Sequence, residues 1–392
     1  MAGAPPFADH AQVTLANWTD PPFNRWAFQH LRELIPTAPI PRPDQPRPLP
    51  RAARDLLGLR FSSGARELSV ADLLAETYTD GFLVLHHGQI ITEIYMNGLA
   101  PGTEHLLMST SKSVTGTLAG VLAGRGQLDP EAQVTAVLPE LRETSFEGAT
   151  VRDLLDMRAG TRFNEDYDDP DADVRICDRV YLWRPDDGEP RPADALAYFA
   201  TLVNDGEHGG PFRYRSILTD VLGWVLERAG GARLHELLAR DLWQPMGAEF
   251  DASITVDGHG NALADGGICA ALRDVARFGQ LILDGGQAGG RTVVPAEWIA
   301  DTIRGAADGP AAFAAGDGAS YPPGGHYRNF WWVDDPAVPF LHAVGIHGQH
   351  VFVHGPAQVV VVKLSTWPTA TSAKLRHLTT DAALAIAESL RD

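Results

Sequence analysis

The sequence has few cysteines and few lysines, and each shortage narrows what the chain can be. Its two cysteines, Cys177 and Cys269, do not form a C-x-x-C unit and are too few for a disulfide framework. Lysine occurs at only three positions, Lys112, Lys363 and Lys374, since the chain otherwise uses arginine. Arginine keeps its proton in proteins and cannot act as a base, which draws attention to the lysines.

Positive charge is also in short supply. The formal net charge of −18 argues against nucleic acid or an anionic membrane as a partner. The chain does not open with a basic stretch followed by an apolar segment, so we expect cytoplasmic localisation. Its 392 residues, 44% of them hydrophobic and 21% charged, are typical of a globular protein with two or three domain-sized units.

Several common functional signatures are missing as well. The sequence has no G-x-S-x-G elbow, no P-loop and no G-x-G-x-x-G motif. His235-Glu236 has Ala239 where a zinc site needs a second histidine. A calcium-loop-like start at Asp169 has Val174 in place of the required glycine. We therefore expect no metal and no cofactor.

What the chain does have is a serine and a lysine three residues apart, Ser109 and Lys112, at the start of a predicted helix. Positions i and i+3 share one helix face, so the two side chains are within hydrogen-bond reach of each other. A lysine activates a serine only in its neutral form, and we expect Lys112 to be neutral in the resting site. Along the helix, Gly116, Gly120 and Gly124 recur every fourth residue, which predicts close packing of another element.

The hydrophobic pattern places strands towards both ends of the chain and helices between them. We expect irregular chain over 37–52 and polar loops over 161–192 and 204–216. Strands are predicted over 82–86, 90–95, 329–333, 350–354 and 358–365. Helices are predicted from Ser109 and over 151–157, 194–203, 218–228, 232–242, 271–283, 296–304 and 372–390. This order predicts an α+β fold, with a sheet domain formed by 1–128 and 265–392 and a mainly helical domain over 129–264.

A serine–lysine pair also needs a group that delivers a proton to the leaving group. Tyr214, followed by Ser216, is one candidate, because a phenol near a lysine ammonium can act as an acid–base relay. Tyr327 is the rival, since Tyr327-Arg328-Asn329 is a literal Y-x-N.

The order of these motifs resembles that of the β-lactamase/DD-peptidase-like serine hydrolases. The shared motifs are S-x-x-K at Ser109, Y-x-S at Tyr214, a short D-L-L helix near 151–160, W-Q-P-M-G at 243–247 and R-D-V-A-R-F-G at 273–279. Within that family the chain is most similar to the 6-aminohexanoate-dimer hydrolases. The matching segments are P-x-N-R-W-A-F at 22–28, T-Y-T-D at 77–80, N-E-D-Y at 164–167 and G-I-H-G-Q at 345–349.

The resemblance implies an antiparallel sheet flanked by helices, an inserted all-helical domain and an active site between them. It also implies Ser109 as nucleophile, Lys112 as base and Tyr214 as proton relay, with the backbone N–H groups of Ser109 and Ile346 as oxyanion hole. For substrate binding it points to Tyr167, which would bond the amide, Trp183, which would close over it, Asp178, which would face the amino end, and Ser216, Asp265 and His347.

Two departures shape the expected function. The family's K-T-G has no lysine here, and either Ala343-Val344-Gly345 or His347-Gly348-Gln349 occupies its place. Ser216 replaces the asparagine of Y-x-N. We therefore expect a serine hydrolase of short linear amides and esters, acting as a 6-aminohexanoate-dimer hydrolase with carboxylesterase activity. The alternatives are a carboxylesterase without useful amidase activity, a β-lactamase or peptidase, and a non-catalytic ligand-binding relative. The expected partner is a small-molecule amide or ester, and a homodimer is left open.

Overall fold

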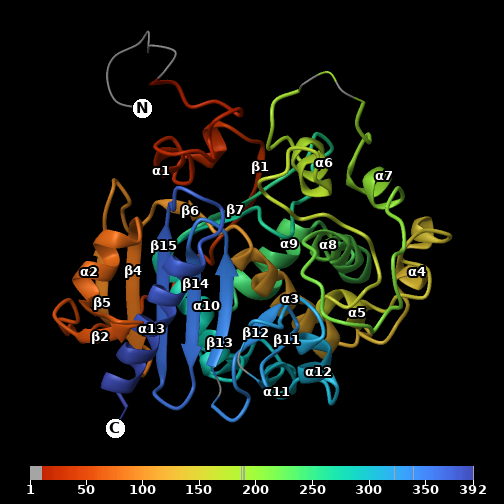
Figure 1. Cartoon of the computed structure of the whole chain (residues 1–392). Helices are drawn as coiled ribbons and strands as arrows, with labels where there is room; N and C mark the ends of the chain where they lie inside the picture. Colours follow the sequence, from red (N-terminus) through yellow and green to blue (C-terminus); the bar gives the residue numbers. More distant parts are fainter. Residues whose placement is uncertain (1–10, 187, 189, 322, 339, 392) are drawn as a thin grey trace.

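The computed structural model describes residues 11–391 except 187, 189, 322 and 339, and its main feature is a seven-stranded antiparallel sheet in the order β11-β12-β13-β14-β15-β4-β5 (Figure 1). The strands are β4 (Thr79–His86), β5 (Gln89–Tyr95), β11 (His326–Arg328), β12 (Trp331–Val333), β13 (Phe340–Gly345), β14 (Gln349–His354) and β15 (Val359–Ser365). The predicted strands are therefore confirmed with small changes at their ends, and β11 and β13 are additions.

Both faces of this sheet are covered. Alternate residues of a strand point to opposite faces, and β15 shows this directly. Its Val360 and Val362 join a core cluster with α10, whereas Val359 and Val361 join another with α13. A strand buried on both sides needs a continuous apolar run, which explains the four consecutive valines of β15.

A smaller antiparallel sheet lies beside the first, in the order β1-β7-β8-β6. Its strands are β1 (Thr37–Ile40), β6 (Glu104–Leu106), β7 (Ala252–Thr255) and β8 (Ile268–Ala271). The prediction of irregular chain over 37–52 is wrong at its start, because β1 pairs with β7 from far along the sequence. A two-stranded hairpin, β2 (Arg60–Ser63) with β3 (Arg66–Ser69), and the short pair β9 (Gln287–Ala288) and β10 (Arg291–Thr292) complete the strands of the described residues.

The predicted helices occur in the predicted order, and the structure adds helices at Val70–Glu76, Val134–Val137, Asp173–Val180 and Gly309–Ala314. The helices are α1 (Asn24–Ala27), α2 (Val70–Glu76), α3 (Thr110–Gly124), α4 (Val134–Val137), α5 (Val151–Leu155), α6 (Asp173–Val180), α7 (Ala195–Phe199), α8 (Ile217–Gly230), α9 (Leu234–Leu238), α10 (Leu272–Leu283), α11 (Ala296–Arg304), α12 (Gly309–Ala314) and α13 (Ala373–Ser389), with a π-helical turn at Ala239–Trp243 and short 3₁₀ turns at Leu31–Glu33 and Pro139–Leu141. No helix among the described residues has the length and apolar character needed to span a membrane.

Helix α6 corrects the expected polar loop over 161–192. Val174, Cys177 and Val180 lie on one face of α6 and are buried, while the charged residues between them are not. A helix with such a narrow apolar stripe is stabilised by tertiary packing rather than by propensity, which is why its polarity suggested a loop.

Helix α3 lies at the centre of the molecule, and every residue from Thr110 to Leu122 is buried. A Cβ atom added at Gly116 would overlap the backbone carbonyl of Asn329, and one at Gly120 would overlap the ring of Trp298. The prediction that these glycines allow close packing is confirmed.

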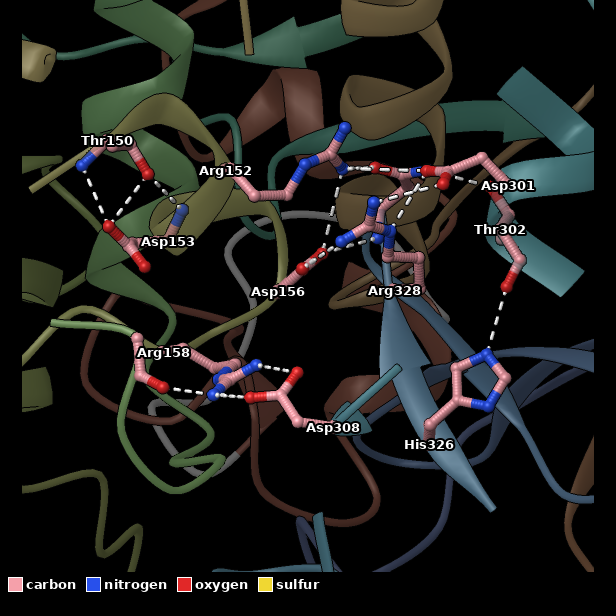
Figure 2. Close-up of polar contacts among 12 residues, drawn as sticks. Thr150, Arg152, Asp153, Asp156, Arg158, Asp301, Thr302, Asp308, His326 and Arg328 are labelled. Carbon is pink, nitrogen blue, oxygen red and sulfur yellow. Dashed lines mark hydrogen bonds and ion pairs between the residues drawn. The ribbon is translucent and has the colours of Figure 1, made fainter. Parts of the chain in front are cut away.

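A network of charged side chains ties α5 to β11 and α11 (Figure 2). The Arg328 guanidinium donates to Asp156, just after α5, and to Asp301 on α11, at 2.9 Å from its Nε. Arg152 on α5 lies 3.8 Å from both carboxylates. Because buried charges are tolerated only when they are paired, this network fixes how the strand hairpin β11–β12 meets the helical segment.

Candidate active site

Ser109 lies immediately before α3, and its hydroxyl accepts a hydrogen bond from Lys112 Nζ at 2.7 Å. The predicted pairing of the two side chains on one helix face is therefore present. Met108, directly before the serine, has a φ of +49°. A non-glycine residue in this left-handed region is strained, and such strain is common at functional sites.

The groups around Lys112 oppose the expectation that its amine is neutral in the resting site. Its Nζ also donates to the backbone carbonyl of Asp265 at 3.1 Å and lies 3.6 Å from Asp265 Oδ2. Burial by itself lowers the pKa of Lys112. The nearby acidic groups, the phenol of Tyr214 and the carboxylates of Asp265 and Glu165, outweigh burial, so the pKa of Lys112 is raised. The Lys112 ammonium of the free site must lose a proton before it can act as a base.

Tyr214 lies next to this pair, since Lys112 Nζ is 5.2 Å from the centre of its ring. Burial raises the pKa of the Tyr214 phenol, and the Lys112 charge and hydrogen bonding to Ser109 oppose that rise. The rival Tyr327 packs behind Tyr214 at 6.1 Å between ring centres and is itself buried. The geometry thus brings Tyr214, and not Tyr327, to the serine.

Ser109 lies where two cavities meet, one of about 860 Å³ and one of about 300 Å³. Ile346, which directly follows β13, lines both cavities as well. No hydrogen bond to another described residue is found for the backbone N–H of Ser109 or of Ile346. Two unpaired N–H groups at one cavity junction are the donors that an oxyanion hole requires.

Strand β13 and the turn after it decide which of the two candidate segments occupies the K-T-G position. Ala343, Val344 and Gly345 form the end of β13, and a Cβ at Gly345 would meet the Leu107 carbonyl beside the serine. His347, with a φ of +59°, lies instead in the turn towards β14. The position beside the nucleophile is therefore taken by Ala343-Val344-Gly345, without a lysine.

Comparison with known proteins agrees with this geometry. The family model described as Beta-lactamase matches residues 70–385. The 6-aminohexanoate-dimer hydrolase of Paenarthrobacter ureafaciens is 40% identical over 365 residues, which cover 93% of this chain and 90% of the relative. The chain belongs to the β-lactamase family of serine hydrolases. The resemblance to 6-aminohexanoate-dimer hydrolases and the predicted fold class are thereby confirmed.

Solved structures share the architecture of this chain. A protein of Bacillus anthracis assigned as a 6-aminohexanoate-dimer hydrolase superposes with a TM-score of 0.89 at 27% identity, covering 98% of both chains. A family VIII carboxylesterase superposes with a TM-score of 0.61 at 18% identity, covering 80% of this chain and 96% of the other. The second match shows a common fold alone.

The residues that family resemblance assigned to substrate binding gather around the smaller cavity. It is lined by Tyr167, Asp178, Trp183, Ser216, Asp265 and His347. The cavity is also lined by Val174 and Cys177 of α6 and by Gly266, shortly before β8. Burial lowers the pKa of His347, whose ring contacts the Trp367 carbonyl at 2.8 Å, so it lines the cavity as a neutral side chain.

Asp178 lies in that cavity but already has partners. Its Oδ2 accepts from Arg175 Nη1 at 2.8 Å and from Arg184 Nε at 3.2 Å. Both arginines line the same cavity. The carboxylate therefore balances two cations at this end of the site, and an incoming ammonium would share it with them.

Glu165 belongs to the predicted polar loop over 161–192, but the structure places it in the site. It accepts from the Ser216 N–H at 2.6 Å, from the Ser216 hydroxyl and from the Tyr167 hydroxyl at 2.7 Å. Burial raises the pKa of Glu165, and the Lys112 charge opposes that rise. Its position in the N-E-D-Y segment, two residues before Tyr167, was the available signal, but six acidic neighbours concealed it.

Proposed function

We propose that this hydrolase cleaves short linear amides and esters through an acyl-enzyme, and that the 6-aminohexanoate dimer is the amide that fits best. The observation that carries the proposal is the 2.7 Å contact between Lys112 Nζ and Ser109 Oγ at the junction of two cavities. A linear substrate can place its scissile carbonyl at the junction and one arm in each cavity. The 40% identity to a 6-aminohexanoate-dimer hydrolase supports the choice of amide.

In the first step Ser109 Oγ attacks the carbonyl carbon while its proton moves to Lys112, which has become neutral. The carbonyl oxygen takes up the negative charge and accepts hydrogen bonds from the N–H groups of Ser109 and Ile346. Donors placed in advance around a developing oxyanion are worth about 10²–10³-fold each in rate.

In the second step the bond to the leaving group breaks, and an amine or alkoxide needs a proton. Tyr214 lines the larger cavity and not the smaller one, so the leaving group occupies the larger cavity and the acyl group the smaller. Tyr214 donates its proton and recovers it from the Lys112 ammonium. Water then attacks the carbonyl carbon of the acyl-enzyme. The same groups move the protons in the reverse order, and the acid is released.

A substrate panel tests the proposal. We expect turnover of the 6-aminohexanoate dimer and of short-chain p-nitrophenyl esters, and little or none of a chromogenic cephalosporin, because no lysine occupies the K-T-G position. Turnover of esters without the dimer would identify the second candidate, a carboxylesterase, which the shared carboxylesterase fold favours. Cephalosporin turnover above both would overturn the proposal.

Cytoplasmic localisation, a homodimer and the division of the chain at 128 and 264 stay predictions of the sequence. Cell fractionation and light scattering test the first two.

A further inference from the structure

A row of stacked rings leads from the catalytic tyrosine to Arg376, and Tyr214, Trp332 and Arg376 of this row line the larger cavity. Tyr214 stacks on Trp332 at 5.6 Å between ring centres and 21° between planes. Trp332 stacks in turn on Tyr321 at 5.1 Å and 13°. The guanidinium of Arg376 lies 5.2 Å from the centre of the Tyr321 ring and ends the row.

Arg376 is held in place by a neutral group and not by a carboxylate. Its Nη1 donates to the Tyr321 hydroxyl at 2.8 Å, and no carboxylate of the described residues lies within ion-pair distance of it. The other two arginines of the cavity differ, since Arg213 pairs with Asp317 at 3.0 Å and Arg215 with Asp205 at 3.3 Å. Arg376 thus keeps an unbalanced positive charge and unused N–H donors on the cavity wall.

The surroundings of Arg376 strengthen its pull on an anion. The side chain is half-buried, and a charge-assisted hydrogen bond gains strength where water is partly excluded. His350 lines the same cavity, and burial together with nearby positive charges keeps its ring neutral, so it supplies no counter-charge. Trp332 lines the cavity together with Tyr214 and Arg376, and its apolar ring suits an alkyl chain with an anion at its end.

We propose that Arg376 binds a carboxylate at the far end of the leaving group and thereby selects amides and esters whose leaving half is an ω-carboxylate chain. This rests on the proposed function, because it is Tyr214 that assigns the leaving group to this cavity. The substrate class is then a linear chain that carries a carboxylate on the leaving half.

The test compares the 6-aminohexanoate dimer with its C-terminal carboxamide, which has the same length and no negative charge. In the wild type we expect kcat/KM for the dimer to exceed that for the carboxamide by about ten- to hundredfold, the usual worth of a charge-assisted contact. Arg376→Gln should lose this preference by raising KM for the dimer alone. Arg376→Lys should keep part of it. Lys374→Gln removes a positive charge from the same helix outside the cavity and is the matched control, which should behave as wild type.

Equal loss on dimer and carboxamide in Arg376→Gln would overturn the inference and make Arg376 a support of the ring stack. A wild type that treats both substrates alike would overturn it too. If the enzyme cleaves no amide, the same comparison is made with the butyrate esters of 6-hydroxyhexanoate and of its carboxamide. A preference for the anionic ester that depends on Arg376 would then uphold the inference although the amidase function had failed.

Discussion

Replacing Asp265 by asparagine should move the pH dependence of this enzyme. The carboxylate of Asp265 lies against the Lys112 ammonium and helps to raise the pKa of Lys112, whose neutral form is the base. Without that negative charge the ammonium is less favoured, so the neutral amine becomes available at lower pH. The rising acid limb of the kcat/KM profile, which reports the free enzyme, should therefore shift towards lower pH.

The separation of 3.6 Å between Lys112 Nζ and Asp265 Oδ2 sets the size of the shift. At an effective dielectric constant of about 20, two unit charges at this distance interact by about 4.6 kcal/mol. One pH unit corresponds to about 1.4 kcal/mol, so the upper limit is about three pH units. An asparagine oxygen still attracts the ammonium, so we expect a shift below this limit but of at least about one pH unit.

The assay measures kcat/KM for hydrolysis of p-nitrophenyl butyrate as a function of pH. This ester has no ionisable group, so the profile reports the enzyme. Asp178→Asn is the matched control: it removes a carboxylate from the same cavity, but one already paired with Arg175 and Arg184, and its acid limb should stay in place. An acid limb of Asp265→Asn that stays where it is in the wild type, or moves to higher pH, would refute the reasoning.

Four further outcomes are expected. Ser109→Ala should abolish turnover with little change in Tm, and a fluorophosphonate should label Ser109 in the wild type; a mass-spectrometric adduct on another serine would contradict the mechanism. Tyr214→Phe should reduce amide hydrolysis more than activated-ester hydrolysis, by about 10²–10⁴-fold on the amide; if Tyr327→Phe does this instead, the wrong tyrosine has been assigned. Asp178→Asn should lower kcat/KM for the cationic dimer and spare uncharged esters, and equal loss on both would mark a structural role. Asp156→Asn should lower the free energy of unfolding by about 3 kcal/mol, since it removes one partner of a buried pair; an unchanged urea midpoint would show that the network in Figure 2 is not stabilising.

Local rules predict local features of this chain well. The Ser109–Lys112 contact follows from the geometry of one helical turn, and the hairpin from β4 to β5 follows from strand alternation and a His87-Gly88 turn with two positive φ values. The spacing of Gly116 and Gly120 predicts close packing because a missing Cβ acts wherever the partner comes from.

Family resemblance carried the prediction further than local rules could. It placed Tyr214, Ile346 and the six residues of the smaller cavity, none of which adjoins Ser109 in sequence. The resemblance could not identify Arg376 as a binding residue. Its proposed role depends on the absence of a nearby carboxylate, and only the fold decides which carboxylates lie close to it.

The sequence by itself determined the contact between Ser109 and Lys112 and the order of strands and helices, because each depends on residues within a few positions of one another. Only the tertiary structure decided that β1 is a strand and that Glu165 faces the site. It alone also decided which groups surround Lys112 and raise the pKa of its amine. The physical reason is shared by all three. A strand edge, a buried carboxylate and a pKa respond to partners brought close by the packing of the whole core, and those partners lie scores or hundreds of residues away along the chain.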